Sequence, residues 1–552
     1  PAATGACTTM TDRRDEHDAS CVPAHDDIDT PIHEDDLEEL VGQPMTVTTT
    51  GGFPDTGIKV PVTDDGRFRS GRLKGLSMGA AIVVLAWPVV LESFLNSLVG
   101  LTDTKLSASL EDGVAATDAI GGASYIMWFI GLVIMAIGVG ATALISRSVG
   151  KGRLGVANVM LGQATTLGLI CGSAIGIVVW FLAPAIVTLL NMSDAAGGYF
   201  IEYMRIIALG TPFASLLFAL IACSRGAGDS MSPLIAMIVR NAINILVSWG
   251  ISGATVFGLT SPLGIDWGVR GIALGTVVGD IFGAGVILSF ALSGKWSIRL
   301  KARNLKPHTI TIYRFVRLAI PNFIETFGMW MGNFFIITFV GLLALQINSE
   351  GLLGAHIIGI RIEAFSFMPG FGMGIAAATL AGQYLGMGRP DLAKKAVFRC
   401  TIIASVIMGA LGIGFIVFAK AITNAMSAQP EHMELVPPLL ITCGIVQIPF
   451  AIGIVFRSAM RGAGDVKWVM GLTWFATYGM RLPLAYLVSG VDIPIPEFMG
   501  GGIITNPRLF EQWFGVAPGL SALWIALCSE MFLRGVVFSI RFFQGGWLKA
   551  KV

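Results

Sequence analysis

Charged residues are scarce in this chain. Asp, Glu, Lys and Arg together make up 13% of its 552 residues, and the acids are concentrated in the first 75 positions. A soluble domain is about 25% charged, so the rest of the chain has too few charges to cover a surface in water. The net charge of +1, without a basic patch, also argues against a nucleic-acid-binding protein.

Several chemical signatures are missing as well. No glycine-rich loop ending in Gly-Lys-Ser or Gly-Lys-Thr occurs, which excludes a P-loop ATPase. There is no HExxH-type cluster, and most of the seven cysteines lie in or beside apolar stretches, as small buried hydrophobic residues do. The sequence therefore favours a protein that is not an enzyme and holds no resident cofactor or structural metal.

Apolar residues make up 54% of the chain. A helix crosses the bilayer core with about 20 mostly apolar residues. Twelve stretches are expected to do so: 77–101, 120–145, 159–182, 200–222, 233–257, 269–292, 314–342, 355–382, 397–419, 437–460, 467–489 and 519–543. The sequence predicts an all-α polytopic membrane protein with twelve transmembrane helices.

Charge outside these stretches predicts the orientation. The loops after every second helix, together with both terminal flanks, hold most of the basic residues, among them Arg147, Lys151, Arg303 and Lys394. By the positive-inside rule both termini are expected in the cytoplasm, with the protein in the plasma or inner membrane. The acidic stretch 1–75 has no helical or strand period and is expected to be a disordered cytoplasmic tail.

The chain repeats itself once. Arg-Gly-Ala-Gly-Asp occurs at 225–229 and again at 461–465, and Gly-x-Gly-Arg occurs at 150–153 and again at 386–389. A proline followed four residues later by a glutamate occurs in the first helix of each half, as Pro88 with Glu92 and Pro321 with Glu325. Each half holds an even number of helices, so the two repeats are parallel, an architecture typical of transporters that bind substrate between the halves.

The repeat divides the chain into four parts. These are the tail over 1–75, an N-terminal lobe with helices 1–6 over 76–293, a basic cytoplasmic linker over 294–313, and a C-terminal lobe with helices 7–12 over 314–552. Alternating access would then arise from rocking one lobe against the other.

The residues resemble the multidrug and toxic compound extrusion (MATE) family. The resemblance rests on the stretch from Pro88 to Lys105 with its aspartate, on both Arg-Gly-Ala-Gly-Asp motifs, and on the glycine- and alanine-rich run 374–383. It implies two six-helix lobes around a cavity, and export of amphipathic, often cationic, compounds in exchange for H⁺ or Na⁺. It also implies a role for Asp103 in coupling.

Three positions depart from the family pattern. Met329 stands where many members have a glutamate, Ser248 stands four residues after Asn244 where an acid is usual, and Gln447 is the polar residue in a helix where some Na⁺-coupled members have an acid. The coupling ion is therefore left open between H⁺ and Na⁺.

Polar residues inside the predicted helices are the candidate ion-coupling and substrate-binding residues. A carboxylate at the bilayer centre costs about 2.5–3.5 kcal/mol on insertion scales, so it points to function. The candidates are Glu92, Asp103, Glu325, Asp280, Glu363, Asn241 and Asn244. Protonation of Glu92, Asp103 and Glu325 is the expected switch. The alternative is a structural role through hydrogen bonds between helices.

Other charged residues are interpreted structurally. Glu202 and Arg205 are expected to form a local pair on one helix. The Arg-Gly-Ala-Gly-Asp motifs are expected to make tight turns that are locked by Arg–Asp bonds. Glu363 and its near neighbour Arg361 face apart, so Arg361 requires another partner.

These observations predict a secondary active antiporter that exports small organic compounds. Its expected partners are the organic substrate, the coupling cation and the lipid bilayer, without nucleic acid, and it is expected to act as a monomer. A lipid-linked oligosaccharide flippase of the same superfamily is the alternative. Such flippases show a more cationic central cavity.

Overall fold

The structure is a computed structural model that describes residues 63, 66–68, 72–110, 112–190, 192–255, 261, 263–347, 351–427, 429–494, 501–515 and 517–550. Almost all of the predicted tail, 1–75, lies outside these residues. The helices described below belong to one compact unit, 51–552.

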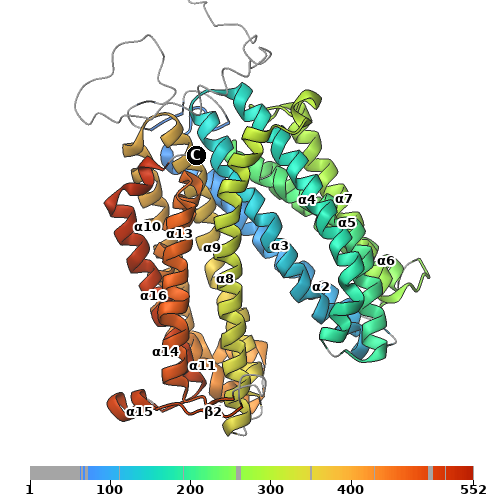
Figure 1. Cartoon of the computed structure of the whole chain (residues 1–552), viewed down its shortest axis with the longest axis vertical. Coiled ribbons are helices and arrows are strands. Elements are labelled where there is room, and N and C mark those ends of the chain that lie inside the picture. Colours follow the sequence, from blue (N-terminus) through green and yellow to red (C-terminus); the bar gives the residue numbers. More distant parts are fainter. Residues whose placement is uncertain are drawn as a thin grey trace, which may run out of the picture. The chain divides into compact units, whose positions relative to one another are not determined.

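Long apolar helices make up nearly all of the described chain (Figure 1). The first half contains α2 (Met78–Ala108), α3 (Gly113–Gly150), α4 (Leu154–Leu189), α5 (Asp194–Gly226), α6 (Met231–Ser252) and α7 (Gly268–Ser293). The second half contains α8 (Thr309–Ile347), α9 (Leu352–Gly386), α10 (Pro390–Met426), α11 (Pro430–Ile445), α12 (Gln447–Ala463), α13 (Val466–Trp474), α14 (Leu482–Ser489), α15 (Leu509–Phe514) and α16 (Leu520–Gln544). The all-α fold class is confirmed.

Each of the twelve predicted ranges coincides with one helix or with consecutive helices. Within the described residues, ten helices are long and apolar enough to cross a membrane, and α11 with α12 forms an eleventh candidate that is bent by 58°. Pro449 lies in the first turn of α12, where it cannot donate to the preceding turn, so the break falls at Val446. The range 467–489 is occupied by α13, a π-helix over Phe475–Arg481, and α14.

The loop before α16 carries the described strands. Ile493–Pro494 (β1) pairs antiparallel with Ile503–Ile504 (β2), and α15 follows. These elements lie at the opposite end of the second half from the loop that joins α9 to α10 (Figure 1).

The predicted linker, 294–313, is a strap along α4. It contains a short 3₁₀ helix, Ala302–Leu305, and α8 begins within it at Thr309. The Gln163 amide of α4 donates to the backbone oxygens of Asn304 and Lys306 at 2.9 and 2.7 Å, and accepts from the His308 backbone N–H at 2.8 Å. These hydrogen bonds satisfy backbone groups that a free linker would leave to water.

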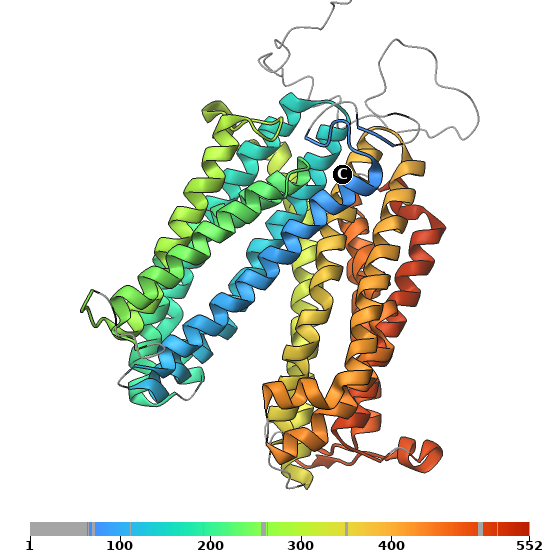
Figure 2. The ribbon, with the colours of Figure 1, turned by 180° about the vertical axis from the view of Figure 1, so that it is seen from behind.

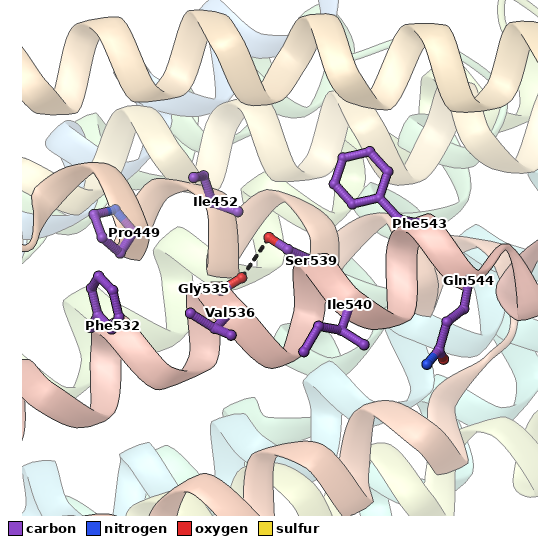
Figure 3. A pocket seen from close by; sticks show the side chains of 9 residues that line it. All are labelled: Pro449, Ile452, Phe532, Gly535, Val536, Ser539, Ile540, Phe543 and Gln544. Atoms are coloured by element: carbon purple, nitrogen blue, oxygen red, sulfur yellow. Dashed lines mark hydrogen bonds between the residues drawn. The ribbon is translucent and has the colours of Figure 1, made fainter.

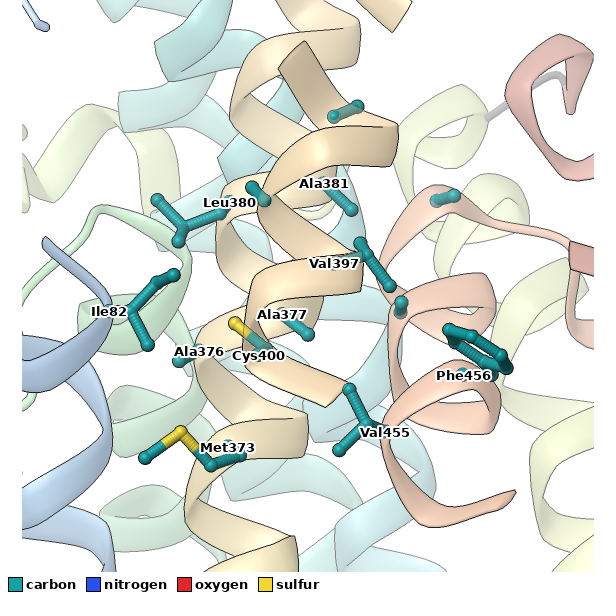
Figure 4. Packing of buried hydrophobic residues seen from close by; sticks show 14 of the residues in the cluster. Ile82, Met373, Ala376, Ala377, Leu380, Ala381, Val397, Cys400, Val455 and Phe456 are labelled. Atoms are coloured by element: carbon teal, nitrogen blue, oxygen red, sulfur yellow. The ribbon is translucent and has the colours of Figure 1, made fainter. Parts of the chain in front are cut away.

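The two halves form separate helix bundles, which contact each other mainly through α2 and α3 of the first half and α8 and α9 of the second (Figure 2). Ile82 of α2 lies in the same buried cluster as Ala376 and Leu380 of α9 (Figure 4). Cys400 of α10 and Val455 of α12 complete this side of the cluster. Small side chains on α9 allow the neighbouring helices to approach closely, as in other membrane bundles.

Equivalent residues of the repeat meet where the bundles touch. A Cβ atom added to Gly150, the last residue of α3, would lie 2.1 Å from the backbone oxygen of Gln383 on α9. A Cβ atom added to Gly386, its counterpart, would lie 2.4 Å from the backbone oxygen of Arg147. The repeated Gly-x-Gly-Arg motif therefore lies at the contact between the halves. We call the end of the molecule that carries both Gly-x-Gly-Arg motifs, 150–153 and 386–389, the basic end.

Candidate functional site

Four of the seven predicted site residues gather inside the first bundle, around an arginine that the sequence interpretation missed. Arg240 of α6 donates from Nε to Asp280 Oδ1 of α7 at 2.5 Å and from Nη1 to Asn241 Oδ1 at 3.1 Å. The Asn244 amide donates to Thr276 Oγ1 at 3.0 Å. The partner of Asp280 therefore comes from a neighbouring helix.

Asp103 of α2 belongs to the same cluster, but one of its carboxylate oxygens has no hydrogen-bond partner among the described residues. Arg240 lies within electrostatic reach of Asp103. Asp103 Oδ1 is buried, and no hydrogen-bond partner for it lies among the described residues. A buried acceptor without a partner is costly, so this atom is the natural place for a proton or a ligand. We call Asp103, Arg240, Asn241, Asn244 and Asp280 the first-bundle cluster.

Glu92 lies elsewhere, in an ion pair near the basic end. Its Oε2 is 2.6 Å from Nη2 of Arg225, which is in the last turn of α5. The Arg225 backbone oxygen accepts a hydrogen bond from Thr379 Oγ1 of α9 at 3.0 Å, so the pair adjoins the contact between the bundles.

Glu325 makes the equivalent ion pair in the second half. Arg461 Nη2 lies 2.8 Å from Glu325 Oε2, and Thr473 Oγ1 donates to Glu325 Oε1 at 2.9 Å. Glu325 is fully buried. In this conformation both proline-linked glutamates are paired with an arginine.

The Arg-Gly-Ala-Gly-Asp motifs make the predicted tight turns, and Asp465 makes an Arg–Asp bond, but the arginines of the motifs have other partners. Their arginines bind Glu92 and Glu325 rather than the aspartates of the motifs. Asp229 instead accepts from Ser232 Oγ, and Asp465 pairs with Arg541 at 2.8 Å. The glycines do make tight turns, with φ of 92° at Gly228 and 89° at Gly464, a region that favours glycine.

Glu363 of α9 lies inside the second bundle, apart from the first-bundle cluster. It is buried and within electrostatic reach of Arg481 and Glu530. Arg361 is exposed, and the other partner predicted for it is not found among the described residues. The predicted local pair of Glu202 with Arg205 is wrong: Arg270 Nε donates to Glu202 Oε2 at 2.9 Å, and Arg205 lies over the Trp180 ring.

A groove of about 680 Å³ lies between α12 and α16, away from these charges (Figure 3). It is lined mainly by apolar residues such as Pro449, Phe532 and Phe543. Its Ser539 hydroxyl is already bonded to the Gly535 backbone oxygen at 2.6 Å. The groove therefore offers packing surface but no chemistry for ion coupling.

The long apolar helices and the buried charges define a polytopic membrane protein with two helix bundles and ionisable groups inside each, an arrangement typical of membrane transporters. The family model MatE matches residues 88–249 and again 321–487, more than half of the chain. The chain belongs to this family, the multidrug and toxic compound extrusion transporters.

Curated relatives and solved structures agree with this. The chain is 25% identical over 476 residues to a probable multidrug resistance protein NorM of Thermotoga maritima, covering 85% of this chain and 93% of the relative. It is 23% identical over 461 residues to the multidrug resistance protein PmpM of Pseudomonas aeruginosa, covering 82% and 90%.

Two solved structures share the fold. The bent conformation of a MATE protein has a TM-score of 0.72 at 19% identity and covers 86% of this chain and 97% of its own. An outward-facing multidrug resistance MATE family transporter has a TM-score of 0.71 at 20% identity and covers 85% and 97%.

Proposed function

We propose that this chain exports small amphipathic organic compounds in exchange for protons, and that Asp103 is the carboxyl group that carries the proton. The observation that supports this most directly is the buried, partnerless Oδ1 of Asp103 beside the Arg240–Asp280 ion pair. A carboxyl group in apolar surroundings holds a proton more readily than in water, because burial penalises the charged form.

The cluster favours H⁺ over Na⁺. A hard metal cation needs several oxygen ligands at once, whereas a proton needs one carboxylate oxygen. Here the Arg240 guanidinium already binds the oxygens of Asp280 and Asn241, and it offers only N–H donors, which cannot coordinate a metal cation. Ser248 supplies no carboxylate, and its hydroxyl donates to the Ile272 backbone oxygen at 3.3 Å.

Coupling follows because the proton and a cationic substrate compete for the negative charge of Asp103. When Asp103 is protonated, the cluster holds a balanced pair of Arg240 and Asp280, and a cationic substrate has no charge to bind. When the proton leaves, Asp103 becomes the unmatched negative charge that attracts the substrate. Substrate and proton then oppose each other through a single site, which is the coupling that an antiporter requires.

The arrangement of the bundles supports an outward-facing state. The basic end is proposed to face the cytoplasm, with both termini on that side of the plasma or inner membrane. The contact of Gly150 with α9 then closes the space between the bundles on the cytoplasmic side. A single chain carries both bundles, so we propose that it acts as a monomer.

The test is transport in vesicles that contain the purified full chain. Efflux of a fluorescent organic cation is measured under an imposed pH gradient and, separately, under an imposed Na⁺ gradient. We expect the pH gradient to drive transport and Asp103→Asn to abolish it. Asp118→Asn, on an exposed residue of α3, is the control and should retain it. Transport driven by Na⁺ alone, or proton-driven transport by Asp103→Asn, would refute the proposal.

A lipid-linked oligosaccharide flippase is the second candidate, because arginines are numerous inside the second bundle. The multidrug resistance names of relatives that align over most of the chain favour the exporter. Failure of both gradients together with flipping of a lipid-linked oligosaccharide would favour this candidate.

A further inference from the structure

The second bundle has an unbalanced set of buried charges. Glu325 is shared by two arginines: Arg461 Nη2 lies 2.8 Å from its Oε2, and Arg457 Nη1 lies 4.0 Å from its Oε1. The other buried guanidinium groups are those of Arg481 and Arg534, and the other buried carboxyl groups are those of Glu363 and Glu530. Even when all three carboxyl groups are ionised, the four guanidinium groups exceed them by one positive charge. An unmatched buried charge is costly unless a ligand compensates it.

Two of these arginines converge on Met329 of α8. Arg457 Nη1 lies 3.1 Å from the Met329 sulfur, and Arg534 Nη1 lies 3.8 Å from the same atom. A thioether is a weak acceptor, so it compensates neither charge. Met329 is partly exposed.

The donors around Met329 are only partly used. Arg457 Nε is buried, and no partner for it lies among the described residues. Arg534 uses Nη2 to donate to Thr477 Oγ1 at 2.9 Å and is paired with Glu530 on its own helix. Arg457 is 8% exposed, so more than nine-tenths of it is buried.

Arg481 supplies a third guanidinium from the π-helix. It is 9% exposed, and its Nε has no partner among the described residues. It lies within electrostatic reach of Arg534 and Glu530. The π-helix also carries Thr477, four residues earlier, and such irregular turns are frequent at functional sites.

We propose that Arg457, Arg481 and Arg534 form a site for an anionic group, a carboxylate or a similar oxyanion, of the transported compound, beside Met329. Guanidinium groups bind such oxyanions through paired N–H donors. The polarisable Met329 sulfur would contact the apolar part of the same compound. This inference rests on the proposed export function and extends it to zwitterionic compounds.

The experiment compares two ligands that differ in one group: a rhodamine methyl ester, which is cationic, and the matching free acid, which is zwitterionic. Binding to the purified full chain in phosphatidylcholine nanodiscs is followed by fluorescence polarisation, without any gradient. We expect the wild type to bind the free acid at least about tenfold more tightly than the ester, as a charge-assisted hydrogen bond would provide.

Substitutions then test which residues cause the preference for the free acid over the ester. Arg457→Gln should remove most of it. Met329→Glu should also remove it by placing an internal carboxylate between the arginines; because it supplies a partner for buried charge, it is not expected to unfold the protein. Met329→Gln, which adds no charge, should lower the preference less. Arg270→Gln, in an exposed pair of the first bundle, is the control and should leave it unchanged.

Three results would overturn the inference: equal affinity for the two rhodamines, a preference that survives both Arg457→Gln and Met329→Glu, or competition by phosphatidylglycerol in the nanodiscs, which would assign the site to a lipid phosphate. The export proposal is tested separately, by proton-driven transport of the ester. If that transport fails while the free-acid preference holds, the site stands and the export proposal falls. If proton-driven transport of the ester succeeds while the free-acid preference is absent, only the proposed anion site is rejected.

Discussion

The contact between α3 and α9 at the basic end should determine how long the bundles stay closed there, and Gly150→Ala tests this. The new Cβ atom would lie 2.1 Å from the Gln383 backbone oxygen, far inside van der Waals contact. Both groups are backbone-anchored, so no side-chain rotation relieves the clash. Overpacking of this kind costs about 1–3 kcal/mol, which corresponds to a shift of about 5–150-fold in a two-state equilibrium.

If the contact is made only in the state described here, the substitution favours the state that is open at the basic end. Spin labels attached at Lys151→Cys, directly after α3, and at Lys395→Cys, near the start of α10, report the separation by pulsed electron paramagnetic resonance. We expect a new population at longer distance in Gly150→Ala and in its counterpart Gly386→Ala. Gly121→Ala, on the same helix with nothing within 4 Å of the added atom, is the control.

An unchanged distance distribution in both variants would refute this reasoning. A lower thermal unfolding temperature with no change in distance would also refute it, because the contact would then stabilise the fold without distinguishing two states.

Other substitutions test individual ion pairs and hydrogen bonds, both buried and exposed. Glu325→Ala should destabilise the protein by about 3–5 kcal/mol, because it leaves Arg461 without its partner. The double substitution Glu325→Gln with Arg461→Gln should recover part of the lost stability, as measured by thermal unfolding. Thr276→Val leaves the Asn244 amide without its acceptor and should cost about 1–3 kcal/mol; an unchanged unfolding temperature would show that this hydrogen bond is not maintained. Arg270→Gln removes an exposed ion pair and should leave the unfolding temperature unchanged, and a clear drop would contradict that.

The helices could be predicted from the sequence because the bilayer fixes their length and composition. Each apolar stretch corresponds to one helix or to consecutive helices, and most helices are longer than predicted: α8 covers Thr309–Ile347 against the predicted 314–342. An exception is α6, which ends at Ser252 against the predicted 257. Backbone hydrogen bonding continues outside the hydrocarbon region, where the apolar pattern ends. Bends such as that between α11 and α12 depend on local backbone geometry, which the apolar pattern does not reveal.

The partners of the buried charges could be predicted only in part. Asp103, Asp280, Asn241 and Asn244 were candidates because polar groups inside apolar stretches are costly, and they do gather. Arg240 was missed, although an arginine inside an apolar stretch carries the same signal. That it binds Asp280 depends on how α6 and α7 are rotated against each other, which a single sequence does not specify.

Pairing across helices also explains the error at Glu202. The local rule that joins residues three apart on a helix is worth only about 0.2–0.5 kcal/mol. A bidentate arginine from α7 outweighs it, so Arg270 binds Glu202 and Arg205 is left to lie over Trp180.

The comparison of the two bundles shows which features the repeat retains and which have diverged. Both bundles keep a glutamate one turn after a proline, and an arginine from the same motif holds it near the basic end. The polar interiors differ: the first has two aspartates around Arg240, and the second has four arginines with three glutamates. Under the proposed mechanism, the symmetric ion pairs support the rocking of both halves. The first bundle then binds the proton and the cationic end of a substrate, and the second bundle binds its anionic end.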